Sequence, residues 1–286
     1  MPLALTAIVL WSTLALLSTR LGHVPPFLVV GLALSVGGLC GISRWRDWRV
    51  PWTTALLGCY GLFGYHFCLL LALRFAPALE ANLVNYLWPV LIVLLSPVVL
   101  PGKRLRWGHV VGGLMGLLGT VVLVLGRGVV QLDTRHLFGY ALAALAAVMW
   151  STYSLLTRKV APFPTGAVGG FCLLSGVLAL LAHAVLEPPI ALTASDWSLL
   201  LLLGLGPMGA AFYLWDAALK AGDPRAIGTL AYLTPLLSTA LLATFGDGRF
   251  GWNAGVALGL ILCGAWLGNR ASVGLPLREP PAQADE

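Results

Sequence analysis

The sequence predicts an all-α integral membrane protein with ten transmembrane helices, arranged as two inverted repeats of five helices each. Three observations support this prediction: the composition, ten apolar runs of membrane-spanning length, and motifs shared by the two halves. Of the 286 residues, 59% are hydrophobic and only 10% are charged, whereas a soluble domain carries about 25% charged residues. Lipid can surround that much apolar surface, and water cannot.

The apolar runs give the predicted helices. A helix needs about 20 apolar residues to cross about 30 Å of hydrocarbon. Arg, Lys, Pro, Gly or Asp separates nearly every run from the next. The first run has no basic segment before it and no convincing cleavage site after it, so we expect a retained helix. The ten runs are 3–19, 26–43, 52–73, 79–99, 107–126, 137–157, 165–186, 196–218, 225–245 and 252–269.

The basic residues of the loops predict the orientation. When the loops are assigned alternately to two sides, twelve of the 17 Lys and Arg residues fall on the side of the N-terminus. Lys and Arg are enriched in cytoplasmic loops. We therefore expect a multi-pass protein of the bacterial inner (plasma) membrane with both termini in the cytoplasm.

Short motifs recur between the two halves of the chain. Residues 9–20 resemble residues 148–159 at an offset of 139, and both contain Trp-Ser-Thr. Tyr-Leu-Trp-Pro at 86–89 and Tyr-Leu-Thr-Pro at 232–235 are separated by 146 positions. Each half contains five spans, which is an odd number, so the halves must cross the membrane in opposite directions. Inverted repeats of this kind are common in secondary transporters and place the binding site between the halves.

This pattern divides the chain into two repeats and a tail. We assign residues 1–130 to the first repeat, 131–270 to the second, and the Pro-rich, polar residues 271–286 to a disordered cytoplasmic tail. The net charge of +6 is scattered, which argues against a nucleic-acid surface. The five cysteines form no CxxC pair, so we expect buried apolar side chains, with no metal site and no cofactor.

One face of the fourth run and its counterpart in the ninth combine polar side chains with a proline. A proline inside a helix leaves one carbonyl without its partner and usually kinks the helix. Paired helix breaks in the two halves of a transporter indicate its binding site. The alternative is ordinary packing, because asparagines bond between membrane helices and prolines are common in them. The residues are Asn82, Asn85, Tyr86 and Pro89 in the first half, and Gly228, Thr229, Tyr232 and Pro235 in the second. Thr234 is a further polar candidate beside this second face.

Four tryptophans lie deep inside their runs: Trp11, Trp88, Trp150 and Trp215. They form either the wall of a chamber for a hydrophobic or aromatic substrate, or ordinary packing. Six other tryptophans lie near run ends and fit an interfacial belt. These are Trp45, Trp48, Trp52, Trp107, Trp197 and Trp252.

Titratable groups and small residues add further candidates. Charged groups inside a membrane are costly and are functional candidates, which selects Glu80, Asp216 and His66 for coupling. Glu80 also suits a helix N-terminus, and Asp216 precedes Lys220 by four residues, an ordinary ion-pair spacing. Pro207 lies among glycines and suits a hinge. Glycines in steps of four predict packing faces on the fifth and tenth helices. These glycines are Gly108, Gly112 and Gly116, and Gly255 and Gly259.

These features together resemble the EamA branch of the drug/metabolite transporter superfamily, over about residues 3–270. The resemblance rests on the repeats, each with an early Trp-Ser-Thr helix and a proline in its fourth helix. Residues 81–96, 215–225 and 234–238 resemble amino acid exporters of that family. The resemblance implies the EamA-like transporter fold and the export of aromatic and other neutral amino acids by alternating access. It implies substrate binding by Trp11, Asn82, Asn85, Tyr86, Trp88, Trp150, Tyr213, Tyr232 and Thr234, with Pro89, Pro207 and Pro235 as kinks or gates.

Other functions stay open at this point. The protein could export other small metabolites or drugs, although no deep Lys or Arg is present to hold a phosphorylated solute. A membrane-embedded enzyme or a lipid-handling protein is less favoured, because the sequence contains no HExxH, GxSxG or phosphate loop. We expect small-molecule amino acids and the lipid bilayer as partners, and a functional monomer.

The predicted orientation can be tested by cysteine labelling. In a variant lacking the native cysteines, a cysteine placed at position 286 should be protected from a membrane-impermeant maleimide in intact cells. It should react after the cells are permeabilised, because the basic loops place this end in the cytoplasm. Labelling in intact cells would contradict the predicted topology.

Overall fold

The computed structural model describes residues 1–102, 104–126, 133–245 and 251–273, and all regular elements within these ranges are helical. In this part of the chain, nine helical stretches are long and apolar enough to cross a membrane. The number rises to ten if α3 (Pro26–Cys40) and the 3₁₀ segment η1 (Ile42–Trp48), which meet at a bend of 90°, form one span. The structure therefore accounts for nine of the predicted spans directly.

Up to residue 126, the chain combines short helices joined end to end with longer single helices. It contains α1 (Pro2–Ser12), α2 (Leu14–Arg20), α3, η1, α4 (Trp52–Cys59), the π-helical segment η2 (Tyr60–Gly64), α5 (Tyr65–Phe75), α6 (Ala78–Asn85), α7 (Trp88–Val99) and α8 (Trp107–Leu125).

The second half likewise combines long single helices with shorter helices joined end to end. It contains the 3₁₀ turn η3 (Thr134–His136), α9 (Leu137–Leu156), α10 (Ala167–Leu186), α11 (Ala194–Leu205), the π-helical segment η4 (Gly206–Ala210), α12 (Ala211–Ala221), α13 (Pro224–Leu230), α14 (Leu233–Phe245) and α15 (Trp252–Val273). The helix α15 therefore extends three residues into the predicted tail, and the remainder of that tail lies outside the described residues.

The irregular helical segments recur at the spacing found in the sequence. The π-helical segments η2 and η4 are separated by 146 positions, as are the helices α5 and α12 that follow them. The fourth span is interrupted between α6 and α7, and the corresponding stretch of the second half is interrupted between α13 and α14. Two distant parts of the chain thus share the same departures from regular helix.

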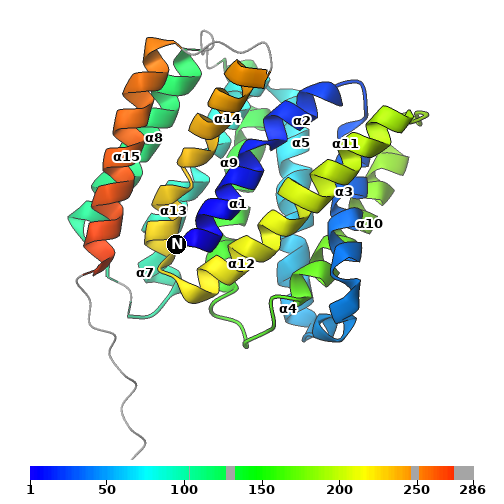
Figure 1. The fold of residues 1–286 in the computed structure, drawn as a ribbon, viewed down its shortest axis with the longest axis horizontal. Helices are drawn as coiled ribbons and strands as arrows, with labels where there is room; N and C mark the ends of the chain where they lie inside the picture. Colours follow the sequence, from blue (N-terminus) through cyan, green and yellow to red (C-terminus); the bar gives the residue numbers. More distant parts are fainter. Residues whose placement is uncertain (103, 127–132, 246–250, 274–286) are drawn as a thin grey trace, which may run out of the picture.

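The bundle has two flanks, each made of one helix from each half. Figure 1 shows α8 beside α15 at one flank and α3 beside α10 at the other, with α1, α9, α12 and α13 between them. Close packing depends on glycine at both flanks. A methyl group added at Gly112 would lie 2.5 Å from the Gly264 carbonyl oxygen, and one added at Gly38 would lie 2.7 Å from the Leu173 nitrogen.

The glycine prediction for the tenth helix is wrong in its choice of residues. A methyl group added at Gly255 or Gly259 would meet no described atom within 4 Å, so these glycines face outward. Gly264 and Gly268 contact α8 and α13 in their place. The sequence shows the step of four but not the rotation of the helix about its axis, and only the rotation decides which glycines face a neighbour.

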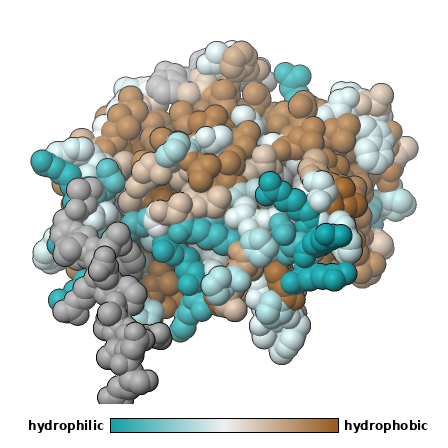
Figure 2. All heavy atoms as spheres, turned by 60° about the horizontal axis from the view of Figure 1, so that its bottom comes forward, coloured by the Kyte–Doolittle hydropathy of each residue, from teal (hydrophilic) through white to brown (hydrophobic). Residues whose placement is uncertain are grey.

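Apolar and polar surfaces are separated on the outside of the molecule. Figure 2, with the lower end of Figure 1 turned forward, shows hydrophilic side chains gathered on that end below a broad apolar region. Trp107 and Trp252, at helix ends, are 81% and 82% exposed. Amphipathic tryptophans are enriched at membrane interfaces, so this pattern suits a band of lipid around the bundle.

A buried carboxylate joins the halves at the end opposite to the one shown in Figure 2. Glu187, which directly follows α10, accepts hydrogen bonds from the backbone N–H groups of Phe27 and Leu28 at the N-terminus of α3, at 3.0 and 3.3 Å. Arg74 and His183 contact the same carboxylate. An anion at a helix N-terminus satisfies unpaired N–H groups, so Glu187 fixes α3 against α10.

Two alanine substitutions on matched glycines test the flank packing. Gly112→Ala should destabilise the protein by about 1–3 kcal/mol, because the new methyl group overlaps the backbone of α15. Gly259→Ala should be neutral or stabilise by up to about 1 kcal/mol, because alanine favours helix and the site is open. Thermal unfolding of both purified variants measures the difference, and equal midpoints would contradict the assigned contact.

Candidate functional site

Seven aromatic side chains meet in the middle of the bundle, and we call them the aromatic cluster. Five helices from both halves contribute to it: α1, α5, α7, α9 and α12. Neighbouring ring centroids lie 5.0 to 6.4 Å apart, within the usual range for aromatic contacts. The members are Trp11, Tyr65, Trp88, Trp150, Tyr153, Phe212 and Trp215.

The rings of the aromatic cluster contact one another directly. Trp11 lies 5.0 Å from Trp215 and 5.8 Å from Trp150, between ring centroids. Trp215 and Trp150 are 1% and 4% exposed. In this conformation the tryptophans expected to line a chamber pack against each other.

The two Trp-Ser-Thr motifs hold the cluster from both halves. Trp11 and Trp150 occupy the same position in each motif, and their rings touch. The following serines, Ser12 and Ser151, donate hydrogen bonds to carbonyls three residues back in their own helices. The helix α1 ends at Ser12, so the motif places Trp11 beside an interruption of the first span.

A polar pair adjoins the aromatic cluster. The Asn85 side-chain amide donates to the Tyr65 hydroxyl at 3.2 Å, and the Tyr65 ring lies 5.3 Å from that of Trp150. Asn85 is 6% exposed, and its Oδ1 has no hydrogen-bond partner among the described residues. An unsatisfied buried acceptor costs about 1–3 kcal/mol, so this oxygen is a candidate acceptor for a ligand N–H group.

Several predicted site residues lie apart from the aromatic cluster. Tyr232 accepts a hydrogen bond from the Val90 backbone N–H at 3.2 Å and packs with Leu236 and Ile261. The Tyr213 hydroxyl donates to the Gly37 carbonyl at 3.1 Å. Both tyrosines therefore pack between helices, which residue type and helical spacing could not distinguish from a place in the site.

The remaining polar candidates make local contacts or stay open. Asn82 donates to the Ala78 carbonyl of its own helix at 2.8 Å. The Thr234 hydroxyl is buried without a hydrogen-bond partner among the described residues. Tyr86 occupies the interruption between α6 and α7. Asn85 is the candidate whose side chain is hydrogen-bonded to a member of the aromatic cluster, Tyr65.

The three predicted gating prolines all lie at helix irregularities. Pro89 is the second residue of α7, just after the interruption of the fourth span. Pro235 is the third residue of α14, and Pro207 lies inside the π-helical segment η4. Proline has no N–H to donate, so regular helical bonding fails near each of these positions.

The titratable candidates have specific neighbours. Asp216 pairs with Lys220 at 2.6 Å and accepts from the Thr165 hydroxyl at 2.7 Å. His66 contacts the Leu62 carbonyl through Nδ1 at 2.6 Å and lies against Phe212 at the edge of the aromatic cluster. Glu80 is 5% exposed in the first turn of α6. The Asp216 contacts join α12 to the segment before α10.

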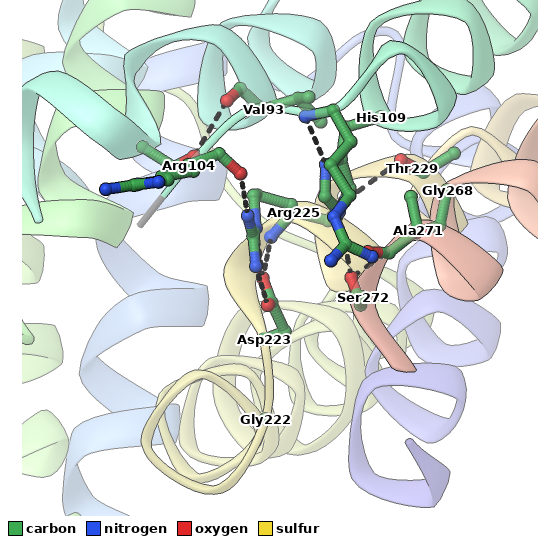
Figure 3. A network of polar contacts seen from close by, with 12 residues as sticks. Val93, Arg104, His109, Gly222, Asp223, Arg225, Thr229, Gly268, Ala271 and Ser272 are labelled. Carbon is green, nitrogen blue, oxygen red and sulfur yellow. Dashed lines mark hydrogen bonds and ion pairs between the residues drawn. The ribbon is translucent and has the colours of Figure 1, made fainter. Parts of the chain in front are cut away.

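Sequence reasoning missed a fully buried arginine at the lower end of the bundle. Arg225 is 0% exposed, its Nε donates to Asp223 at 2.9 Å, and its Nη1 donates to the Arg104 carbonyl (Figure 3). From the neighbouring loop, Arg158 donates to the Gly222 carbonyl at 2.6 Å. Arg225 thus joins the start of α13 in the second half to the loop before α8 in the first.

A second set of contacts joins α8 to the end of α15 beside Arg225 (Figure 3). The Arg106 backbone N–H donates to His109 Nδ1 at 3.1 Å, which leaves the N–H on Nε2 to donate to Ser272 at 3.1 Å. Arg106 also donates to the Ala271 carbonyl at 3.3 Å. For Arg225, the available sequence signal was the Asp-Pro-Arg start of α13. Asp at the N-cap and Pro at the first position favour a helix start.

Comparison with known proteins relates the chain to membrane transporters. The model of the EamA-like transporter family matches residues 1–125 and 137–270. Two relatives are named aromatic amino acid exporter YddG. The one from Ancylobacter novellus is 46% identical over 268 residues, which cover 91% of this chain and 93% of that protein. The one from Escherichia coli K12 is 28% identical, and the match covers 94% of this chain and 97% of that protein.

A solved structure shares the fold. A crystal structure of a protein 45% identical to this chain has a TM-score of 0.90 and covers 94% of this chain and 95% of its own. At this similarity, the course of the helices through the site is common to both proteins.

Two Asp-x-Arg helix starts with different burial provide a matched test of the arginine contacts. Arg225→Gln should destabilise the protein by about 3 kcal/mol, because it breaks a buried ion pair and a contact between the halves. Arg135→Gln should cost at most about 1 kcal/mol, because the same pairing with Asp133 is solvent-exposed there. Thermal unfolding measures both, and a small effect at Arg225 would show that the buried network contributes little.

Proposed function

The chain belongs to the EamA-like transporter family, and we propose that it exports aromatic and other neutral amino acids from the cytoplasm by alternating access. The single observation that carries the proposal is the aromatic cluster, which gathers four tryptophans from both halves beside one open polar acceptor. The two relatives named aromatic amino acid exporters support the same substrate class.

The proposed site recognises the two ends of an amino acid in different ways. Trp11, Trp88 and Trp150 separate to admit the side chain, which gains burial worth about 25 cal/mol per Å² of apolar surface. The Asn85 Oδ1 accepts from the ammonium group, which every amino acid shares. The deep tryptophans have no deep Lys or Arg beside them in the described part of the chain, so the carboxylate is held weakly and is released easily.

We also propose that the two halves are inverted five-helix repeats, giving ten spans with α3 as the second. The family model matches one stretch in each half, and the irregular segments recur at an offset of 146. The fourth and ninth spans are both interrupted, as expected for helices that bend at a central site.

Alternating access requires that the halves separate at one end at a time. At the lower end of Figure 1, Arg225 links α13 to the loop before α8. At the other end, Arg74 of α5 pairs with Glu187 after α10, at 3.2 Å. We propose that the Arg225 contact closes the cytoplasmic end of the pathway and that the Arg74–Glu187 pair closes the outer end. Both termini then lie in the cytoplasm of a bacterial cell.

Transport measurements on tryptophan and asparagine variants test the site. Trp11→Ala and Trp150→Ala should each reduce transport of Phe by about threefold to tenfold, and reduce transport of Ala less, because an aromatic contact contributes ~0.5–1.5 kcal/mol. Asn85→Ala should reduce transport of Phe, Met and Ala by similar factors, because it contacts the shared ammonium group. Uptake of radiolabelled amino acids into proteoliposomes measures these rates, normalised to the amount of protein inserted.

The same assay separates the proposal from its rivals. Equal losses for Phe and Ala in the tryptophan variants would show that these rings have a packing role. Failure of the native protein to transport any amino acid, with transport of another small solute, would favour a metabolite or drug exporter of the same family.

A further inference from the structure

The chain leaves α3 in a direction suited to the membrane surface. The segment η1 (Ile42–Trp48) begins two residues after Cys40, and its axis makes an angle of 90° with that of α3. When α3 crosses the bilayer, η1 therefore lies along its surface. This geometry follows from membrane insertion alone and holds for any transported solute.

The exposed side chains of η1 are of two kinds. Ile42 and Trp45 are 54% and 48% exposed and apolar. Arg44, Arg46 and Arg49 are exposed as well. Among the described residues the side chains of Arg44 and Arg46 make no hydrogen bond or ion pair, and Arg49 lies 5.0 Å from the Trp45 ring centroid.

The segment also forms a hollow and is held firmly on the bundle. Residues 43–47 line an open hollow of about 460 Å³. Trp48 packs against α10, where a methyl group added at Gly170 would lie 3.1 Å from its ring. The Asp47 side chain lies close to Gly166 at the start of α10, where an added methyl group would overlap it. The arginines therefore project from a fixed platform rather than from a free loop.

We propose that η1 and Arg49 bind the headgroup of an acidic phospholipid of the surrounding leaflet. The three guanidinium groups supply charge and paired N–H donors for a phosphate. Ile42 and Trp45 supply apolar surface for the upper part of the acyl chains, and tryptophan favours this depth in a membrane. Basic residues beside a membrane helix attract anionic lipids, whereas a zwitterionic lipid provides no net charge to attract.

Three features make a lipid the occupant rather than a soluble anion. The platform lies beside the apolar surface of α3, including Leu39, which is 50% exposed. Its exposed apolar residues alternate with the arginines along the segment, so headgroup and chain contacts are offered together. Residues 42–49 contain three arginines and one acidic residue, Asp47, so the platform carries a net positive charge.

The test compares lipid binding by the purified full chain in detergent, measured by native mass spectrometry. Phosphatidylglycerol and phosphatidylcholine of identical chains are offered in equal amounts, and the native protein should retain phosphatidylglycerol preferentially. The triple variant R44Q/R46Q/R49Q should bind phosphatidylglycerol at least about tenfold more weakly, given the contribution of each basic residue near a charged surface. The triple lysine variant R44K/R46K/R49K should retain most of the preference.

A control removes charge at other exposed arginines. The variant R20Q/R135Q changes two exposed arginines outside η1 and should keep the lipid preference of the native protein. Amino acid transport and size-exclusion behaviour of the triple variant confirm that it is folded. Equal retention of the two lipids by the native protein, or an undiminished preference in the triple variant, would overturn the proposal. Competition by free glycerol phosphate at the same concentration would overturn it in favour of a soluble anion site.

Discussion

A chain in lipid must satisfy its own backbone hydrogen bonds, and the architecture of this protein follows from that constraint. Each unpaired N–H or C=O in hydrocarbon costs several kcal/mol, so the described chain is helical throughout its regular elements. Breaks in a helix are tolerated only where protein surrounds them. The breaks at α1–α2, α6–α7 and α13–α14 and the π-helical segments consist mostly of buried or half-buried residues, so neighbouring protein surrounds much of the irregular backbone.

The centre of the bundle combines this irregular backbone with aromatic side chains. Trp88 is the first residue of α7, directly after a break in the fourth span. Trp11 is the second-last residue of α1, just before the break between α1 and α2. These two rings are therefore attached to short helices beside interruptions of their spans. Polar contacts through Arg225 and Glu187 connect the halves at the two ends of the bundle. Aromatic contacts and the hydrogen bonds of Tyr213 and Tyr232 connect them as well.

Much of the fold was predictable from the sequence, and less of the site. Hydropathy located the spans, and the repeated Trp-Ser-Thr motif identified Trp11 and Trp150 as equivalent positions of the two halves. Each signal depends only on residue type and spacing. The contacts of Tyr213 and Tyr232 with Gly37 and Val90 could not be predicted, since helix rotation decides which face of a helix meets which neighbour. The burial of Arg225 was missed because a cation in a short loop is normally exposed.

The contact between the tryptophan rings has a consequence for the empty protein. The rings proposed to receive a substrate also contact one another, so they would compete with it for the same space. The apparent affinity for a substrate is then a difference between two similar packing energies, which suits a carrier that must release its cargo. In the proposed site, Trp215 and its neighbours would also close the pathway when no cargo is present, because their rings are buried against one another.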